Sequence, residues 1–335
     1  MRIESDFSVL PIVHYQLSII HYPLNKLAHF IVYSKAATYI AALLCIAMWV
    51  LHFVEQGGVG HSYFALLMWV LATYFSVKFG RDLSFNEARS TLPVTLFFMG
   101  CALAPQMGMG YSGVLHFLLF STACYVLLRT YRDRSAMGSY FLAFALIGVQ
   151  CLMAPPLLLT LPCVVLCGAF MESLHGRTFL ASLWGLLFPY WVTCGVLFLT
   201  DRTALIAPYL GQMLPVPLAM SSVLDSPQLW AQPLWMLLLV LPSSVVLLLN
   251  RTMRIQASAG YRLLMLALVV LLVTVVISPA YYAMLSPCIL LHVSLIGATM
   301  FVGGENRARN IYLVILFVMW LASLGLYVWN NFLSY

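Results

Sequence analysis

Apolar residues occur in long unbroken runs along this chain, and charged residues lie mostly in the short stretches between the runs. A helix that crosses the hydrocarbon core of a membrane needs about 20 apolar residues. The sequence therefore predicts an all-α, polytopic integral membrane protein with about eleven transmembrane helices, the third and fifth of them short. They are expected at 36–54, 61–79, 90–105, 111–130, 137–153, 156–172, 178–200, 233–250, 260–278, 281–302 and 311–332.

The first 35 residues differ from the rest because polar groups interrupt their apolar pattern. Glu4, Asp6 and three histidines precede the first long apolar run, a pattern that is not typical of a cleavable signal. The stretch from Phe7 to Tyr33 mixes aliphatic and aromatic residues with histidine and lysine. It predicts a cytoplasmic amphipathic helix on the membrane surface, with a break at Pro23; an extra, half-inserted helix is the alternative.

One connection between the predicted helices is long. Residues 201–232 are apolar for a loop and contain four prolines, at 208, 215, 217 and 227. Such a segment is expected to lie in the membrane interface or to cover a cavity at the outer face, or simply to cover helix ends. The chain thus divides into segment 1–35, helices 1–7 over 36–200, the outer loop 201–232, and helices 8–11 over 233–335.

Composition and charge support this interpretation and give the chain an orientation. Hydrophobic residues make up 63% of the chain and charged residues 8%, with a mean hydropathy of +0.97, which excludes a soluble protein and an outer-membrane barrel. Fifteen of the sixteen Lys and Arg residues fall on one side of the predicted membrane, and only Arg202 falls on the other. The positive-inside rule then places the N-terminus in the cytoplasm and the C-terminus outside. The net charge of +6 follows from this topology and does not indicate nucleic-acid binding.

Ionisable side chains are nearly absent from the predicted spans. His116 and His292 come closest to the middle of a helix; each is either hydrogen-bonded to a neighbour or part of a functional site. All eight cysteines lie in apolar stretches. Cys163 and Cys167 share a helical face, but no other ligand accompanies them, so no metal site is predicted. The sequence identifies no cofactor.

Three carboxylates are expected at the outer face: Glu55, Asp201 and Asp225. Glu55 ends the first span, and His61 opens the second across a short turn, which makes this pair the only compact acid–base candidate there. Asp201 adjoins Arg202, and Asp225 lies in a Ser-Pro context typical of a turn. Ordinary interfacial or surface roles remain the alternative for each of these residues.

The stretch from Phe79 to Leu199 resembles the core of the membrane glycosyltransferases of the C superfamily, which use polyprenyl-phosphate sugars. The resemblance covers four consecutive segments. They are a basic-ended helix at Val114–Arg132, a helix that leads into a proline motif at Phe141–Gly148 with Leu152–Pro156, an apolar helix at Leu157–Met171, and a basic turn at Arg177. Residues 186–190 (LLFPY) also resemble membrane proteins of Bacteroidetes with this layout. Ala154 replaces the lysine of the family's Lys-Pro motif, and the tight turn 55–60 replaces its long acidic loop.

The resemblance implies a bacterial inner-membrane protein that transfers or handles a lipid-linked sugar at the outer face. Glu55 would act as base or metal-binding carboxylate together with His61. Arg202 would hold the lipid phosphate, and Asp201 and Asp225 would contact substrate. The expected partners are membrane lipid, polyprenyl phosphate and other membrane proteins, with no nucleic acid. The alternatives are a non-catalytic subunit of an envelope complex and a transporter of lipid or apolar solutes.

Overall fold

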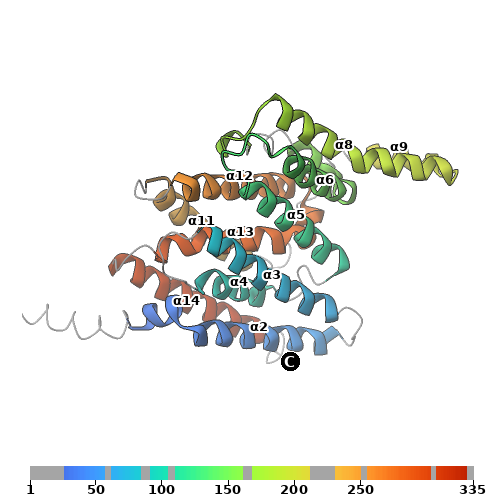
Figure 1. Ribbon diagram of the computed structural model, residues 1–335. Coiled ribbons are helices and arrows are strands. Elements are labelled where there is room, and N and C mark those ends of the chain that lie inside the picture. The colour runs from blue at the N-terminus through green and yellow to red at the C-terminus, as the bar shows by residue number, and fades with distance from the viewer. Residues whose placement is uncertain are drawn as a thin grey trace, which may run out of the picture.

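The computed structural model describes residues 26–56, 62–83, 91–104, 110–160, 168–211, 231–249, 255–302 and 307–329. Within these ranges the chain forms helices and turns and contains no strand, which confirms the all-α class. A helix over 26–33 precedes the named elements, of which Figure 1 labels the α-helices. These are α2 (Lys35–Gln56), α3 (Ser62–Asp82), α4 (Leu92–Leu103), α5 (Tyr111–Leu128), α6 (Met137–Met153), η1 (Pro155–Thr160), α8 (Gly176–Leu199), η2 (Thr203–Leu205), α9 (Ile206–Gly211), α11 (Ala231–Leu249), α12 (Ile255–Ile277), η4 (Pro279–Tyr281), α13 (Tyr282–Val302) and α14 (Arg307–Val328).

Seven segments in the described part of the chain are long and apolar enough to cross a membrane. They lie in α2, α5, α8, α11, α12, η4 with α13, and α14, whereas α4 and α6 are shorter apolar helices. The chain is therefore a multi-pass membrane protein by length and composition. The count of eleven crossings and the orientation of the chain stay predictions.

Helix α13 forms the centre of the bundle, and α8 lies at its periphery (Figure 1). In an apolar 18-residue window of the segment Pro279–Phe301, 89% of the residues are buried inside the protein, against 22% in such a window of Gly176–Leu199. α13 packs against α3, α4, α5, α11, α12 and α14, whereas α8 packs mainly on α6. An apolar helix that is buried all round is typical of the core of a large bundle.

Buried polar side chains tie the central helices together through backbone carbonyls. Gln232 donates through Nε2 to the Gly100 carbonyl at 3.0 Å, and its Oε1 accepts from Tyr282 at 3.0 Å and from Ser286 at 3.2 Å. Trp320 Nε1 donates to the Met99 carbonyl at 2.7 Å. These bonds supply partners to polar groups that lipid cannot satisfy, and they join the end of α4 to α11, α13 and α14.

The structure differs from the sequence-based prediction at the sixth apolar run, 156–172. Pro155–Thr160 form a 3₁₀ helix where a transmembrane α-helix was expected, and residues 161–167 lie outside the described residues. Pro155 and Pro156 have no N–H to donate, and the first amide after them, at Leu157, bonds to Ala154 in the i→i+3 pattern at 3.0 Å. This 3₁₀ segment is covered by α6 and α12, as non-helical backbone at membrane depth must be.

The contacts of α6 with α8 show that the two helices run parallel. Gly185 lies against the backbone of Phe141, near the start of α6, and Gly148, further along α6, lies against Leu186 and Pro189. A Cβ atom at Gly148 would come within 2.7 Å of the Leu186 carbonyl oxygen. Glycines that let two backbones approach this closely are typical of helix pairs in membranes.

Candidate functional site

The acid–base pair predicted at the outer face falls largely outside the described residues. Glu55 lies in the last turn of α2, but its side chain, as well as His61 and Asp225, is not among the described residues. The pairing of Glu55 with His61 therefore stays a prediction.

Asp201 and Arg202, predicted to bind substrate, form the end of α8. The Arg202 amide donates to the Leu197 carbonyl at 2.9 Å, and the Asp201 amide donates to Phe198 at 3.3 Å. Asp201 has a φ of 54°, in the left-handed region. These are the two hydrogen bonds and the left-handed residue of a Schellman motif, which satisfies the last carbonyls of a helix. Asp201 thus has a structural role that explains its position.

A pair of tyrosines lies next to this helix end, where the chain doubles back from α8 into α9. The Tyr209 hydroxyl donates to the Cys151 carbonyl at 3.0 Å and lies 3.3 Å from the Tyr190 hydroxyl. Burial raises the pKa of Tyr209, so its phenol is a neutral hydrogen-bond donor near pH 7. These contacts hold the start of the outer loop against the ends of α6 and α8. No local sequence pattern indicates these contacts, because Tyr209 lies 58 residues from Cys151 along the chain.

A second polar cluster joins α5, α6 and α8 at the end of the bundle predicted to be cytoplasmic. The Ser173 hydroxyl lies 2.7 Å from that of Tyr140 and 3.3 Å from that of Thr130, and Thr178 donates to the Ser173 carbonyl at 3.0 Å. All four residues are buried. Their mutual bonds leave little capacity for a ligand, which makes this cluster a structural joint.

An ion pair covers the same joint from outside. Arg132 Nε donates to Glu172 Oε2 at 2.6 Å, and the Arg132 amide bonds to the Met171 carbonyl at 3.0 Å. Both Arg132 and Glu172 have left-handed backbone, with φ of 57° and 53°. The hydrogen bond that Arg132 donates to Glu172 raises the pKa of Arg132. Because both side chains are more than half exposed, the pair fixes the geometry of two turns more than it adds stability.

The two histidines noted in the sequence are both fully buried within the bundle. Among the described residues, neither ring nitrogen of His116 has a hydrogen-bond partner, and the Nε2 atom of His292 has none either. His292 Nδ1 lies 2.7 Å from the Cys288 carbonyl. Gln150 of α6 reaches the His116 carbonyl at 3.4 Å and leaves its own Oε1 unpaired. His116 and Gln150 therefore form a polar spot in the apolar core. Gln150, a lone polar side chain in an apolar run, could have been noted from the sequence.

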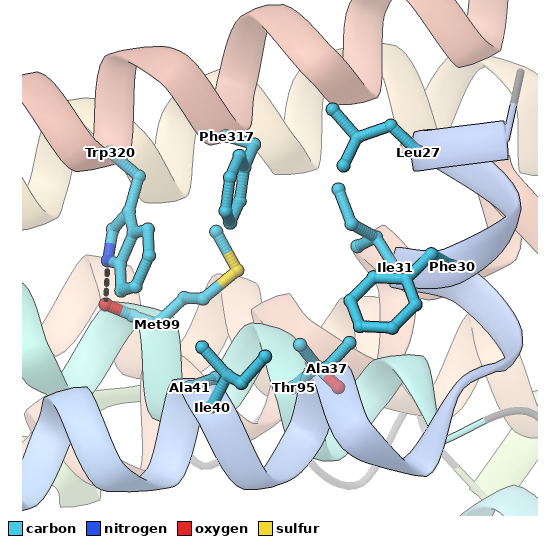
Figure 2. A pocket seen from close by; sticks show the side chains of 10 residues that line it. All are labelled: Leu27, Phe30, Ile31, Ala37, Ile40, Ala41, Thr95, Met99, Phe317 and Trp320. Atoms are coloured by element: carbon cyan, nitrogen blue, oxygen red, sulfur yellow. Dashed lines mark hydrogen bonds between the residues drawn. The ribbon is translucent and has the colours of Figure 1, made fainter. Parts of the chain in front are cut away.

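One concave feature of the described residues is an apolar cavity of about 60 Å³ between helix 26–33, α2, α4 and α14. Figure 2 shows Phe317 and Trp320 reaching from α14 toward Met99, while Leu27 and Ile31 of helix 26–33 close one end. Its one polar side chain is Thr95, whose hydroxyl already bonds to that of Thr38 at 2.8 Å. The sequence did not reveal this cavity.

Among the described residues, no group of three His, Cys, Asp or Glu side chains is placed to hold a metal ion. Cys163 and Cys167 lie outside these residues.

Comparison of the chain with protein-family models, with curated proteins and with solved structures finds no match. The function must therefore be argued from the residues themselves.

Proposed function

We propose that this chain is a multi-pass inner-membrane protein that handles a lipid-linked substrate, with the apolar chain of the lipid held in the cavity of Figure 2. The single observation that supports this proposal is the chemistry of the cavity walls. A site of this volume has room for water, but a buried water needs two to four polar partners, and here the only polar side chain is already bonded. A hydrocarbon chain is the occupant that such walls favour, and the surrounding membrane supplies it.

The finer proposal is that the protein transfers a sugar from a polyprenyl-phosphate donor at the outer face. It rests on the sequence resemblance of residues 79–199. Because Asp201 caps α8, its position needs no catalytic explanation, and the acid–base chemistry then depends on Glu55 with His61. Arg202, which is exposed beside this cap at the end of α8, would hold the lipid phosphate. Because α8 and the cavity helices α2 and α14 lie on opposite sides of the bundle (Figure 1), this transfer site is a proposal separate from the cavity.

The cavity is tested by filling it. Ala41 of α2 lines the cavity and is 3% exposed, so Ala41→Phe places a ring in the space that the lipid chain would occupy. Leu43→Phe on the same helix is the matched control, because Leu43 is 65% exposed and faces outward. We expect lipid extracted from the purified protein to decrease in Ala41→Phe and to remain in Leu43→Phe. Equal lipid content in both variants would overturn the proposal.

The reaction is tested by complementation of a deletion strain with Glu55→Gln, alone and combined with Asp201→Asn and Asp225→Asn. General acid–base catalysis contributes about 10²–10⁴-fold to rate, so Glu55→Gln should almost abolish activity while the protein is still produced. Full rescue by the triple variant would contradict the transferase proposal, since no predicted outer carboxylate would remain.

Full rescue would instead favour a second function, a non-catalytic membrane subunit. The peripheral position of α8 supports this alternative. Its outward face exposes 62% of Trp184 and 75% of Trp191, and its main packing partner is α6. Large exposed aromatic surfaces are typical of sites where another protein or lipid packs.

A further inference from the structure

Two cysteine side chains meet between α2 and α4. A hydrogen bond joins the thiol of Cys101, on α4, to the thiol of Cys45, on α2. Both are free thiols; Cys45 is 2% exposed, and Cys101 is half-buried. Two thiols in contact have a chemistry that a single buried cysteine lacks, because the loss of two electrons joins them in a disulfide.

A second contact between the same two helices supports this pairing. The hydroxyl of Thr38 on α2 lies 2.8 Å from that of Thr95 on α4. Cys45 follows Thr38 by seven residues and Cys101 follows Thr95 by six, which is about 10 and 9 Å along helices with a rise of 1.5 Å per residue. The two helices therefore run in the same direction, and the two cysteines lie at about the same level.

Small side chains on α2 favour the close approach that a disulfide needs. Ala37, Ala41 and Cys45 are four residues apart, so they share one face of the helix, and all three are buried. Ala37 and Ala41 line the cavity together with Thr95, which shows that this face is turned toward α4. Small residues let the backbones of two membrane helices approach closely, and a disulfide joins Cα atoms about 4.4–6.8 Å apart.

The position of the pair along α2 limits which oxidants reach it. Cys45 lies ten residues after Lys35 and eleven before Gln56, the two ends of the helix, so it is about 15 Å from either end. Because α2 is long and apolar enough to cross a membrane, this is the level of the middle of the hydrocarbon core, which is about 30 Å thick. An oxidant dissolved in the bilayer reaches this depth, whereas a charged one in water does not.

We propose that Cys45 and Cys101 form a redox-active pair that a quinone dissolved in the membrane oxidises to a disulfide. The two S–H bonds break and one S–S bond forms, while two electrons and two protons pass to the quinone, which leaves as a hydroquinone. Cys101, the more exposed of the two, is the thiol that the quinone meets first. The disulfide then fixes α2 to α4. This inference depends neither on the occupant of the cavity nor on sugar transfer.

The test uses the full-length protein in phosphatidylcholine vesicles without oxygen. Decylubiquinone, oxidised glutathione or no oxidant is added, the protein is denatured, and free thiols are alkylated and located by mass spectrometry. Cys45→Ala and Cys101→Ala each remove one partner. Cys288→Ala is the matched control, because Cys288 of α13 is a free cysteine that is also buried.

With decylubiquinone we expect Cys45 and Cys101 to lose their alkylation together in the wild type and in Cys288→Ala, with one hydroquinone formed for each disulfide. The remaining thiol should stay alkylated in Cys45→Ala and in Cys101→Ala. Oxidation should also raise Tm in the wild type, because the cross-link restricts the unfolded chain, and leave Tm unchanged in the two single variants.

Three results would overturn the inference. The first is full alkylation of both cysteines in the wild type after treatment with decylubiquinone. The second is loss of Cys101 alkylation in Cys45→Ala, which would indicate a quinone adduct or a disulfide between two copies of the chain. The third is equally rapid oxidation by oxidised glutathione, which would place the pair within reach of water. None of these results bears on lipid binding by Ala41→Phe, so the proposed function is tested separately.

Discussion

Replacing Asp201 by glycine should stabilise the protein, although the sequence suggested a binding role for this residue. At a φ of 54° the Cβ atom of an ordinary residue crowds the following carbonyl, at a cost of about 1–2 kcal/mol, which aspartate reduces in part. Glycine removes this cost and is the preferred residue at this position of a Schellman motif. We therefore expect Asp201→Gly to raise the free energy of unfolding by about 0.5–1 kcal/mol, and Asp201→Val to lower it by about 1–2 kcal/mol.

The measurement is thermal unfolding in detergent, where a change of this size shifts Tm by about 1–3 °C. Asp133→Gly is the control. Asp133 is also an exposed aspartate in a turn, but its φ is not positive, and its carboxylate accepts hydrogen bonds from Ser135 at 2.6 and 2.8 Å. Glycine there should lower Tm. If Asp201→Gly also lowers Tm, or if Asp201→Asn leaves Tm unchanged and abolishes function, the capping explanation is wrong.

Four further predictions follow from the fold. The loops predicted to be cytoplasmic are 80–89, 131–136, 251–259 and 303–310. A single cysteine placed in any of them, in an otherwise cysteine-free variant, should resist an impermeant thiol reagent in intact cells. Labelling at two of these loops would refute the predicted topology. Gly185→Leu should lower the free energy of unfolding by about 1–3 kcal/mol, because its side chain would strike the backbone of α6; Gly195→Leu, with open space around it, should be neutral in the same thermal assay. His116→Leu should raise Tm, because it removes two buried ring nitrogens without partners at about 1–3 kcal/mol each, and a fall in Tm would show that the ring has a partner in the membrane. The hydrogen bonds from Ser135 hold the pKa of Asp133 below its ordinary 3.8. This carboxylate therefore contributes stability above about pH 4, and the contribution is lost as the pH falls below that value. Asp133→Asn should make Tm depend less on pH below about pH 4.

The helices were the part of the fold that the sequence predicted well. Ten of the eleven apolar runs contain an α-helix of 12 or more residues in the described part of the chain, because an uninterrupted apolar run has no other way to satisfy its backbone in lipid, whereas the described residues of 156–172 are α-helical only at 168–170. The exception is the run at 156–172, whose 3₁₀ start follows from two consecutive prolines. Hydrophobicity alone does not distinguish an α-helix from a 3₁₀ segment that neighbouring helices cover.

The candidate sites were predicted less well, because their geometry depends on contacts between distant parts of the chain. The sequence singles out Asp201 as an outer carboxylate, but its role as a helix cap is set by backbone angles. Glycine is the usual sequence signal for such a cap, and no glycine follows α8 at this position. His116 stood out as a polar residue in an apolar run. The proximity of His116 to Gln150, however, depends on how α5 packs against α6, and the hydrophobic periodicity of the two helices does not predict this packing.

The apolar cavity depends on the break at Ser34 between helix 26–33 and α2. Ser34 separates helix 26–33 from α2: its amide bonds to Phe30 at 3.0 Å, and its hydroxyl accepts the Ala36 amide at 3.1 Å, as an N-cap does. The first turns of α2 then present the small side chains of Ala37 and Ala41, which leave space in front of α14, and helix 26–33 closes one end of that space. A serine followed by small residues is a weak local signal. It produces a cavity only because a third helix, nearly 300 residues further along the chain, supplies the opposite wall.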